Sequence, residues 1–345
     1  MRALLMHRFG GPLEVTEVPD PTAPAEGVVV EVHATGLCRS DWHAWAGHDD
    51  GVNLPHVPGH ELAGVVVEVG AGVRRWQVGD RVTVPFVCGC GRCAWCVAGD
   101  AQVCPEQQQP GFTHWGSFAE RVVLHAADVN LVGIPDDVTM PAAASLGCRF
   151  ATAYRALTAR ARLQPGEWVA VVGAGGVGLS AVQIARALGA RVLVVDPNPG
   201  ARASAEALGA EHTLAPDDEL AETITALTGG CHVAVDAVGT EATCAAAIHS
   251  LRRRGRHVQV GLLPPVDGHP RVPMDRVIGW ELDVLGSHGM AAVDYPPMLE
   301  LIAAGSLRPQ DLVRRTVGLS AAATLLPSLG DRGAAGITVI DPRQP

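Results

Sequence analysis

Five of the nine cysteines in this chain lie in the segment CGCGRCAWCVAGDAQVC, residues 88–104. Four of them, Cys90, Cys93, Cys96 and Cys104, have the spacing C-x₂-C-x₂-C-x₇-C, and Cys88 lies just outside that pattern. Zinc prefers thiolate and imidazole ligands, and four thiolates from one loop complete its tetrahedral shell. A complete shell leaves no position for a substrate, so the spacing predicts a structural zinc site.

Three other uses of these cysteines stay open from the sequence: a disulfide pair, inert buried thiols, or an iron–sulfur cluster. The first ten residues, MRALLMHRFG, lack the apolar run and the cleavage site of a signal peptide. We therefore expect a cytoplasmic protein. Thiols in that compartment stay reduced and more often hold metal than form disulfides.

A second group of reactive side chains lies in two motifs nearer the start, GLCRSDWHAW and PGHELAGVVVEVG. The motifs supply a thiol at Cys38, a hydroxyl at Ser40, imidazoles at His43 and His60, and a carboxyl at Glu61. The HELAG stretch is not a zinc-protease motif, because that motif needs a second histidine where this chain has glycine. An acid directly after His60 distinguishes it from an isolated surface or core histidine.

The stretch EWVAVVGAGGVGLSAVQIARALGARVLVVD, residues 167–196, has the G-x-G-x-x-G spacing of a dinucleotide-binding turn. An apolar strand-like run precedes the glycines, an amphipathic helix-like run follows them, and a second strand-like run ends in an acid. The glycines allow a tight turn, close approach of the backbone to a pyrophosphate, and close packing of helix on strand. The helix N-terminus then offers unpaired N–H groups to the phosphates. The predicted coenzyme-binding residues of this stretch are Gly173, Gly175, Gly176, Val177, Gly178 and Asp196.

Asp196 also bears on which coenzyme binds. Its carboxylate can accept hydrogen bonds from the adenosine ribose hydroxyls and would repel a 2′-phosphate, so the sequence favours NAD over NADP. Arg202 lies nearby in the sequence and could turn toward a phosphate, which keeps NADP open. A glycine-rich turn that binds no nucleotide is the other alternative.

Composition and charge limit the classes of partner. Apolar residues make up 48% of the chain and charged residues 18%, so it can bury a sizeable core. A net charge of −10 argues against nucleic-acid binding, which requires a basic surface. The apolar runs have strand length and are too short to span a membrane. We expect a globular protein that binds no nucleic acid and does not span a membrane.

Strand-like and helix-like segments are distributed unevenly along the chain. Short Val-rich segments broken by Gly and Pro fill the first part, which predicts an irregular β-rich domain. Beyond residue 150, strand-like and helix-like segments alternate, as in a parallel βαβ sheet. The expected elements there include strands at 168–172, 191–195, 232–236, 256–260 and 282–286, and helices at 177–188, 201–208 and 242–252.

Taken together, these motifs resemble the zinc-dependent alcohol dehydrogenases of the medium-chain dehydrogenase/reductase superfamily. The resemblance includes GLCRSDWH, GHELAGVVVEVG, the four-cysteine loop, ASLGCRFATAY, and VGAGGVGLSAVQIA with its downstream acid. It implies an α/β fold in which a Rossmann doubly wound parallel sheet, residues 151–287, is inserted into a GroES-like β-rich catalytic domain. That domain would comprise residues 1–150 and 288–345.

The resemblance also implies a catalytic zinc held by Cys38, His60 and Cys148, with a fourth position open for water or substrate. Glu61 resembles the family's acid beside the zinc, which can ligate it transiently. Asp41 resembles the carboxylate that orients the ligand histidine. Cys148 is also consistent with a buried thiol, since relatives use Asp or Glu near this position. With the four-cysteine loop, the expectation is two zinc ions per chain.

By the same resemblance, zinc stabilises the alkoxide of an alcohol substrate while its hydride passes to NAD. Ser40 then accepts the hydroxyl proton, which reaches solvent through the coenzyme ribose and His43. Arg39 occupies a place where relatives contact the coenzyme pyrophosphate. Two departures stand out: Ala201 replaces a ribose-binding lysine, and Cys88 is an additional thiol that could compete for the structural zinc.

The function expected from these residues is the reversible conversion of a primary or secondary alcohol to an aldehyde or ketone. Polyol or threonine dehydrogenase activity is the alternative within the superfamily. A zinc-free quinone reductase is disfavoured by both cysteine sets, and a non-catalytic zinc- and nucleotide-binding scaffold is disfavoured by the intact Cys38, Ser40, His43 and His60. The resemblance also implies a homodimer or homotetramer, because the family forms both, often by joining Rossmann sheets edge to edge. The strand-like segment 282–286 is the candidate for that edge, which would need covering.

Overall fold

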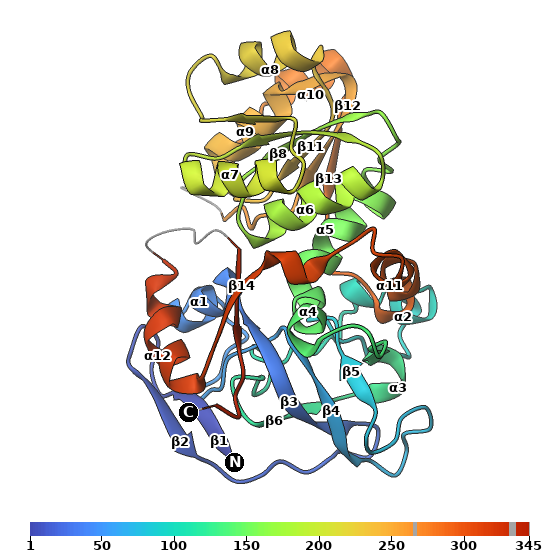
Figure 1. Cartoon of the computed structure of the whole chain (residues 1–345), viewed down its shortest axis with the longest axis vertical. Coiled ribbons are helices and arrows are strands. Elements are labelled where there is room, and N and C mark those ends of the chain that lie inside the picture. The colour runs from blue at the N-terminus through green and yellow to red at the C-terminus, as the bar shows by residue number, and fades with distance from the viewer. Residues whose placement is uncertain (265–267, 331–335, 345) are drawn as a thin grey trace. The chain divides into compact units, whose positions relative to one another are not determined.

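A computed structural model describes residues 1–264, 268–330 and 336–344 of the chain. The chain folds into two compact units, which Figure 1 shows as a ribbon. Unit 1 comprises Met1–Ala151 and Gly289–Pro345, and unit 2 comprises Thr152–His288. Both ends of the chain therefore contribute to unit 1.

Unit 1 is built on a large, mostly antiparallel sheet and a smaller hairpin-like pair of strands. The large sheet has the order β14-β15-β3-β4-β5-β7, and β6 pairs with β3 outside that path. Its last strand in the sequence, β15, pairs antiparallel with β3, so the C-terminal segment completes a sheet begun near the N-terminus. The strands are β1 (Arg2–Met6), β2 (Leu13–Glu17), β3 (Val28–Leu37), β4 (Leu62–Val69), β5 (Arg81–Thr83), β6 (Arg121–Leu124), β7 (Val132–Gly133), β14 (Val313–Val317) and β15 (Ile337–Ile340).

Alternation along the strands supplies the core of this sheet. Val28, Val30 and Val32 of β3 are fully buried in one cluster with Leu62 and Val66 of β4, as a period of two residues requires. The helical elements of unit 1 lie around the sheet. They are α1 (Arg39–Ala46), α2 (Ala94–Val97), η1 (Ala101–Val103), α3 (Ala127–Asn130), α4 (Met140–Ala144), η2 (Leu146–Phe150), η4 (Ala292–Asp294), α11 (Tyr295–Ala303), η5 (Pro309–Leu312) and α12 (Leu319–Ser328).

Unit 2 contains a six-stranded parallel sheet of order β10-β9-β8-β11-β12-β13. This is the Rossmann order, and it reverses between β8 and β11. The strands are β8 (Trp168–Val172), β9 (Arg191–Val195), β10 (His212–Leu214), β11 (Cys231–Asp236), β12 (Leu251–Gln259) and β13 (Asp283–Gly286). The helical elements are α5 (Ala151–Arg155), which begins at the last residue of unit 1, η3 (Ala156–Arg160), α6 (Gly176–Ala187), α7 (Pro199–Ala207), α8 (Leu220–Thr228), α9 (Glu241–His249) and α10 (Met274–Trp280).

The GroES-like and Rossmann fold class expected from the sequence is confirmed. Strand β8, WVAVV, is buried at every residue, as a central strand of a parallel sheet covered on both faces should be. The strands expected at 168–172 and 191–195 coincide with β8 and β9. Both are short apolar runs between clear turn signals, which makes them the easiest elements to locate.

One expected boundary is wrong. The helix expected over 242–252 ends at His249, and residues 251–259 form β12. The Ser250 hydroxyl donates to the carbonyl of Ala247 at 2.6 Å, and Leu251 is buried in the core of unit 2. Arginines at 252–254 favour helix locally, but Leu251 and residues 256–259 pair with β11, and this strand pairing overrides that preference. The elements β10, α8 and α10 are not among those expected from the sequence.

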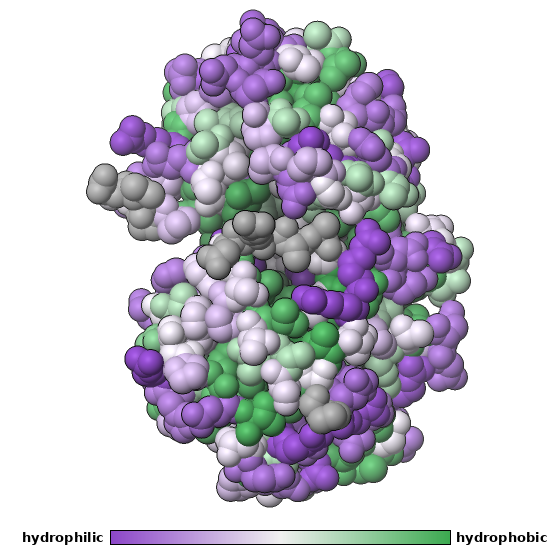
Figure 2. Space-filling view, turned by 60° about the vertical axis from the view of Figure 1, so that its left-hand side comes forward, coloured by the Kyte–Doolittle hydropathy of each residue, from purple (hydrophilic) through white to green (hydrophobic). Residues whose placement is uncertain are grey.

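Among the described residues, no helix is both long and apolar enough to cross a bilayer. The face drawn in Figure 2 carries hydrophilic residues with hydrophobic patches between them on each unit.

Candidate functional site

The residues of the first motif pair meet in the interior of unit 1. Cys38, His60, Glu61 and Cys148 each offer a ligand atom, and these atoms lie within 4.8 Å of one another. Cys38 follows β3 and caps α1, His60 and Glu61 directly precede β4, and Cys148 lies in η2. Cys38, His60 and Glu61 are buried, and Cys148 is partly buried.

Asp41 fixes the orientation of the His60 ring. Its Oδ1 lies 2.7 Å from His60 Nδ1, and it also accepts backbone N–H bonds from Cys38 at 2.9 Å and from Gly59 at 3.2 Å. Asp41 and His60 are completely buried. The hydrogen bond to the carboxylate places the ring proton on Nδ1, which leaves a lone pair on Nε2.

The environment of that lone pair shows whether the residues present fit a metal ion. In the described part of the chain, His60 Nε2 is buried and makes no hydrogen bond. A buried polar nitrogen without a partner costs free energy, and a cation bound between the two thiols would satisfy it. Burial lowers the pKa of His60, but Asp41 and Cys38 outweigh burial and raise it well above its ordinary value in the absence of a metal. A metal ion bound at Nε2 would take the place of the proton that this negative charge favours there. The donor set of two sulfurs and one imidazole nitrogen therefore fits zinc.

The two thiols of this cluster interact directly. A hydrogen bond from Cys148, ahead of the opposing effect of burial, lowers the pKa of the Cys38 thiol well below its usual value. Cys38 Sγ also lies 3.8 Å from Ser40 Oγ. A thiolate is the form that binds metal, so the surroundings already favour the ligand state of Cys38.

Glu61 is held by a residue that sequence reasoning missed. Arg149 donates to Glu61 Oε1 from its backbone N at 3.1 Å and from Nε at 2.9 Å, and its Nη2 donates to Oε2. Both side chains are buried, so this is a two-point ion pair in the interior. Gly36 makes room for it, since a Cβ there would lie 2.1 Å from Glu61 Oε2. The available signal was a charged residue inside the apolar run ASLGCRFATAY.

An irregular helical segment brings Cys148 and Arg149 to the cluster. Thr139 is the N-cap of helix α4, and its side chain accepts from the N–H of Ala142. The following segment η2 is a π-helix. π-Bulges are rare in proteins overall, and those that occur often lie at functional sites. Gly147 lets this segment approach closely, because a Cβ there would lie 2.8 Å from the carbonyl oxygen of Val84.

The four-cysteine loop forms a second cluster. The Sγ atoms of Cys90, Cys93, Cys96 and Cys104 lie within 4.8 Å of one another, and all nine cysteines of the chain are free. Backbone N–H groups of Cys93 and Cys96 point at the sulfurs of Cys90 and Cys93, at 3.4 and 3.5 Å. Hydrogen bonds from the backbone of Arg92 and Cys93 lower the pKa of Cys90 to about 7. These bonds favour the thiolate of Cys90, whereas burial raises the pKa of Cys96 to about 12. Because all nine cysteines are free, the disulfide alternative is wrong.

Cys88 does not belong to this cluster. It is buried in the core of the large sheet, and its thiol donates to the carbonyl of Pro85 at 3.4 Å. Burial raises the pKa of Cys88 to about 12. Cys88 is not among the thiols that lie within 4.8 Å of one another, so it is a core residue and not a competing ligand.

The remaining residues of the first motif lie on α1 beside the cluster. His43 Nδ1 lies 3.0 Å from Nδ1 of His48. Arg39 donates to the carbonyl of Leu329 at 3.0 Å and lies over the ring of Trp42, so its guanidinium is bound within unit 1 in this structure.

The glycine-rich turn lies in unit 2, between β8 and α6. Gly173 has φ +94°, and a Cβ at Gly178 would lie 1.8 Å from the carbonyl oxygen of Gly173, so both positions require glycine. A Cβ at Gly175 would meet no atom within 4 Å, which leaves open space beside the backbone. No side chain caps α6, whose helix begins at Gly176 and continues through Val177. Its first N–H groups are therefore available to an anion.

Asp196 is tied to the same turn. Its Oδ2 accepts from the N–H of Ala174 at 2.7 Å, and its Oδ1 accepts from the N–H of Asn198 at 2.8 Å. Arg202 donates to the carbonyl oxygens of Asp196 and Pro197, at 2.7 and 3.1 Å. The acid and the arginine therefore lie together at the end of β9, close to the glycines. Ala201, in place of a lysine, is buried on α7.

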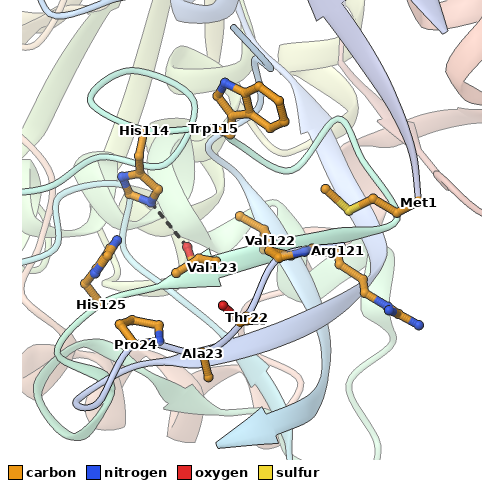
Figure 3. A pocket seen from close by; sticks show the side chains of 11 residues that line it. Met1, Thr22, Ala23, Pro24, His114, Trp115, Arg121, Val122, Val123 and His125 are labelled. Carbon is orange, nitrogen blue, oxygen red and sulfur yellow. Dashed lines mark hydrogen bonds between the residues drawn. The ribbon is translucent and has the colours of Figure 1, made fainter. Parts of the chain in front are cut away.

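A separate hollow of about 430 Å³ in unit 1 contains none of these residues. Figure 3 shows His114 directed at the carbonyl oxygen of Val123, with the ring of His125 beside it. The two rings meet edge to face at 5.1 Å, and burial lowers the pKa of His114 to about 4. The described residues that line this hollow include Arg121 and the two histidines but no cysteine, so the hollow differs from the two cysteine clusters.

Two protein families and several known proteins match this chain. Residues 24–136 match the family model described as "Alcohol dehydrogenase GroES-like domain", and residues 176–304 match "Zinc-binding dehydrogenase". The chain is 36% identical over 313 residues to an alcohol dehydrogenase of Geobacillus stearothermophilus, which covers 89% of this chain and 90% of that protein. It is 33% identical over 321 residues to alcohol dehydrogenase 2 of Caenorhabditis elegans, covering 90% and 89%.

Solved structures agree with these matches. An NAD-dependent alcohol dehydrogenase superposes with a TM-score of 0.90 at 32% identity, covering 99% of both chains. The alcohol dehydrogenase of Thermus sp. ATN1 superposes with a TM-score of 0.89 at 31% identity, again over 99% of both chains.

The Arg149–Glu61 pair generates the first prediction. Arg149→Met leaves a buried carboxylate without its partner, which should lower the free energy of unfolding by about 3–5 kcal/mol. Urea unfolding of the metal-loaded protein, followed by circular dichroism, measures the change. Glu61→Gln added to Arg149→Met should recover part of the loss because it removes the unpaired charge.

Arg308→Gln is the matched control for this prediction. It breaks an exposed ion pair with Asp311, which should cost less than about 1 kcal/mol. Equal effects of Arg149→Met and Arg308→Gln would contradict a stabilising role for the buried pair.

Proposed function

The chain belongs to the zinc-dependent alcohol dehydrogenases of the medium-chain dehydrogenase/reductase superfamily, and we propose that it oxidises primary or secondary alcohols reversibly to aldehydes or ketones. NAD is the hydride acceptor of this enzyme class. The cluster of Cys38, His60 and Cys148, with its one unpartnered imidazole nitrogen, is the observation that carries the proposal.

We propose that these three residues hold a catalytic zinc and leave its fourth position to the substrate. Zinc bound there would act as a Lewis acid on the alcohol oxygen, and NAD would accept the hydride. Asp41 keeps the lone pair of His60 directed at the metal through the hydrogen bond at Nδ1. The Asp41 carboxylate also places negative charge beside the proposed ligands.

The proton of the alcohol needs its own acceptors. Ser40 lies beside Cys38 and is proposed to take the hydroxyl proton, while His43, three residues further along α1, is proposed to carry it toward solvent. Burial, followed by the charges of His48 and Arg39, lowers the pKa of His43. A histidine that is neutral at pH 7 is ready to accept a proton.

Glu61 is proposed to adjust the charge beside the metal. Burial raises its pKa, and Arg149 opposes that effect. While the ion pair with Arg149 is made, both carboxylate oxygens are engaged. Direct ligation by Glu61 would require release from Arg149, so the arginine is proposed to limit how often the acid reaches the metal.

The second cluster is proposed to hold a structural zinc through Cys90, Cys93, Cys96 and Cys104, giving two zinc ions per chain. Four thiolates leave no open position, and the backbone N–H bonds to sulfur are typical of a thiolate site. All nine cysteines are free, which suits a reducing compartment, and we propose the cytoplasm.

The coenzyme is proposed to bind along Gly173, Gly175, Gly176, Val177 and Gly178, with its adenosine ribose at Asp196. The open space at Gly175 and the uncapped α6 support a pyrophosphate there. Arg39 is proposed to contact the pyrophosphate after release from Leu329, and Arg202 to flank the ribose. NAD is favoured over NADP because the Asp196 carboxylate would repel a 2′-phosphate.

A homodimer or homotetramer is proposed for the assembled enzyme. Strand β13 lies at the edge of the six-stranded sheet, and Val284 on it is 45% exposed. An apolar edge strand needs cover, and a second copy of the same strand can supply it. Light scattering of the purified protein measures the number of copies.

The metal assignment leads to the second prediction. Elemental analysis should find two zinc ions per chain, with one lost in Cys38→Ser and the other in Cys93→Ser. Absorbance of NADH over a panel of alcohols, polyols and threonine should rise with the intact protein and stay at background with Cys38→Ser. Cys93→Ser should instead lower the melting temperature, because structural zinc contributes to folding.

Cys88→Ser is the control, since Cys88 lies in the same loop but outside the cluster. It should keep both zinc ions. Oxidation of no alcohol by the zinc-loaded protein would overturn the proposed reaction, and a polyol or threonine as the best substrate would move it within the superfamily.

The third prediction concerns coenzyme choice. Asp196→Asn keeps the side-chain size and removes the negative charge, so kcat/KM with NADP should rise relative to NAD by at least about ten-fold, or about 1.4 kcal/mol. Steady-state kinetics with both coenzymes measure the ratio. Asp218→Asn, an exposed acid elsewhere in unit 2, should leave the ratio unchanged. A wild-type preference for NADP would contradict the proposed role of Asp196.

A further inference from the structure

A pair of histidines at the end of α1 forms a contact that the proposed reaction does not yet use. His43 and His48 approach with Nδ1 atoms 3.0 Å apart and ring centroids 5.3 Å apart. One of the two nitrogens must donate a proton to the other at this distance. His43 is half-buried, whereas His48 is exposed. The pair therefore connects a partly enclosed imidazole with one in contact with solvent.

The backbone at the end of α1 builds this contact. Gly47 has φ +83°, which turns the chain back so that its N–H reaches the carbonyl of Ala44 at 3.2 Å. The N–H of His48 then reaches the carbonyl of His43 at 2.9 Å. These two bonds form a Schellman motif, which needs a left-handed residue at the glycine. His48 is therefore fixed over the last turn of the helix, above His43.

An aromatic ring supports both imidazoles. Trp42 meets His43 edge to face at 4.9 Å and His48 at 5.4 Å. Trp42 is itself covered by the guanidinium of Arg39 at 5.2 Å. The rings are thus held by neighbours on the same helix as well as by the backbone turn.

The charges around the pair are few. Besides His48, the groups that act on His43 are Arg39 and Cys38. Helix α12, which packs against α1, carries no charged residue. Asp49 follows His48, and its carboxylate accepts the N–H of Gly51 at 2.8 Å. A proton on the pair is therefore opposed by Arg39 and favoured by the Cys38 thiolate.

We propose that His48 is the second proton acceptor of the relay, which takes the proton from His43 and passes it to solvent. This inference rests on the proposed function, in which His43 receives the proton of the alcohol. As His43 Nε2 gains that proton, its Nδ1–H bond breaks and a new N–H bond forms on His48 Nδ1. His43 returns to a neutral imidazole, and His48 releases its proton to water. No electrons are transferred in this step.

The arrangement also limits the charge on the pair. Burial lowers the pKa of His43, and the positive charges of His48 and Arg39 lower it further, while Cys38 opposes them. A proton on one imidazole discourages a second on its neighbour. His43 is therefore kept neutral while His48 holds the proton at the exposed end.

The test compares His48→Ala and His48→Asn with His7→Ala, which removes an exposed histidine elsewhere in unit 1. The measurement is alcohol oxidation by the zinc-loaded enzyme from pH 6 to 10. Both His48 variants should lose about ten-fold or less at neutral pH, below the roughly 100- to 10,000-fold of a lost general base. The loss should shrink above about pH 9, where hydroxide can accept the proton from His43 directly. Added imidazole should restore part of the rate of His48→Ala.

A second measurement does not depend on turnover. Nuclear magnetic resonance titration of the His43 ring in the zinc-loaded protein should show a higher pKa in His48→Ala than in the wild type or His7→Ala. The low-pH limb of the rate profile should move in the same direction, because His43 must be neutral to accept a proton.

The possible outcomes distinguish failure of the proposed function from failure of the proposed role of His48. Inactive wild-type enzyme would count against the proposed function, and the His43 titration would still test the contact between the rings. Active wild-type enzyme with the same pH profile in both His48 variants would overturn the relay. An equal loss at every pH, with no rescue by imidazole, would show a purely structural role and would also overturn it.

Discussion

The buried hydrogen bond between Asp41 and His60 is the interaction on which the arrangement of unit 1 depends. One carboxylate, fully enclosed, binds the ring of His60 and the backbone N–H groups of Cys38 and Gly59. It therefore joins the start of α1 to the loop before β4. Removing such a carboxylate would leave several buried donors unpaired, at a cost of about 1–3 kcal/mol each. The same bonds leave the buried Nε2 atom of His60 free of hydrogen bonds to any residue that the structure describes, beside the two thiols.

The buried cation Arg149 balances part of the negative charge around Cys38, His60, Glu61 and Cys148. Two thiols and two carboxylates lie close together, and Arg149 is the cation that pairs with one of those carboxylates. A zinc ion would supply the remaining positive charge, which explains why acidic groups can be concentrated in an apolar interior. The π-helical segment that carries Cys148 also carries Arg149, so a proposed ligand and the balancing charge come from one turn of the chain. The proposed coenzyme site in unit 2 is built from the backbone instead of from buried charges. It offers the N–H groups at the start of α6 and open space at Gly175, and Asp196 is held beside them.

Much of the fold could be predicted because its signals are local. The fold class follows from the fully apolar strand β8 and from the glycines and helix after it, and the family and fold comparisons confirm it. Prediction failed where a local preference met a distant partner. The arginines at 252–254 favour helix, but Leu251 before them and residues 256–259 after them pair with β11, so the arginines fall within β12. The assigned roles of the ligand, relay and coenzyme residues stay predictions, although the structure brings the eight proposed metal ligands into two groups.

The sequence by itself determined the types of side chain, their spacing within one loop or turn, and the glycines that a turn requires. Tertiary structure decided which of these groups touch. Arg149 and Glu61 are 88 positions apart, and no periodicity relates them until η2 packs beside β4. His43 and His48 are only five positions apart, yet their contact depends on the left-handed turn at Gly47. The physical reason is that an ion pair or a shared proton requires atoms within about 3 Å, and only packing of the folded chain sets distances that short.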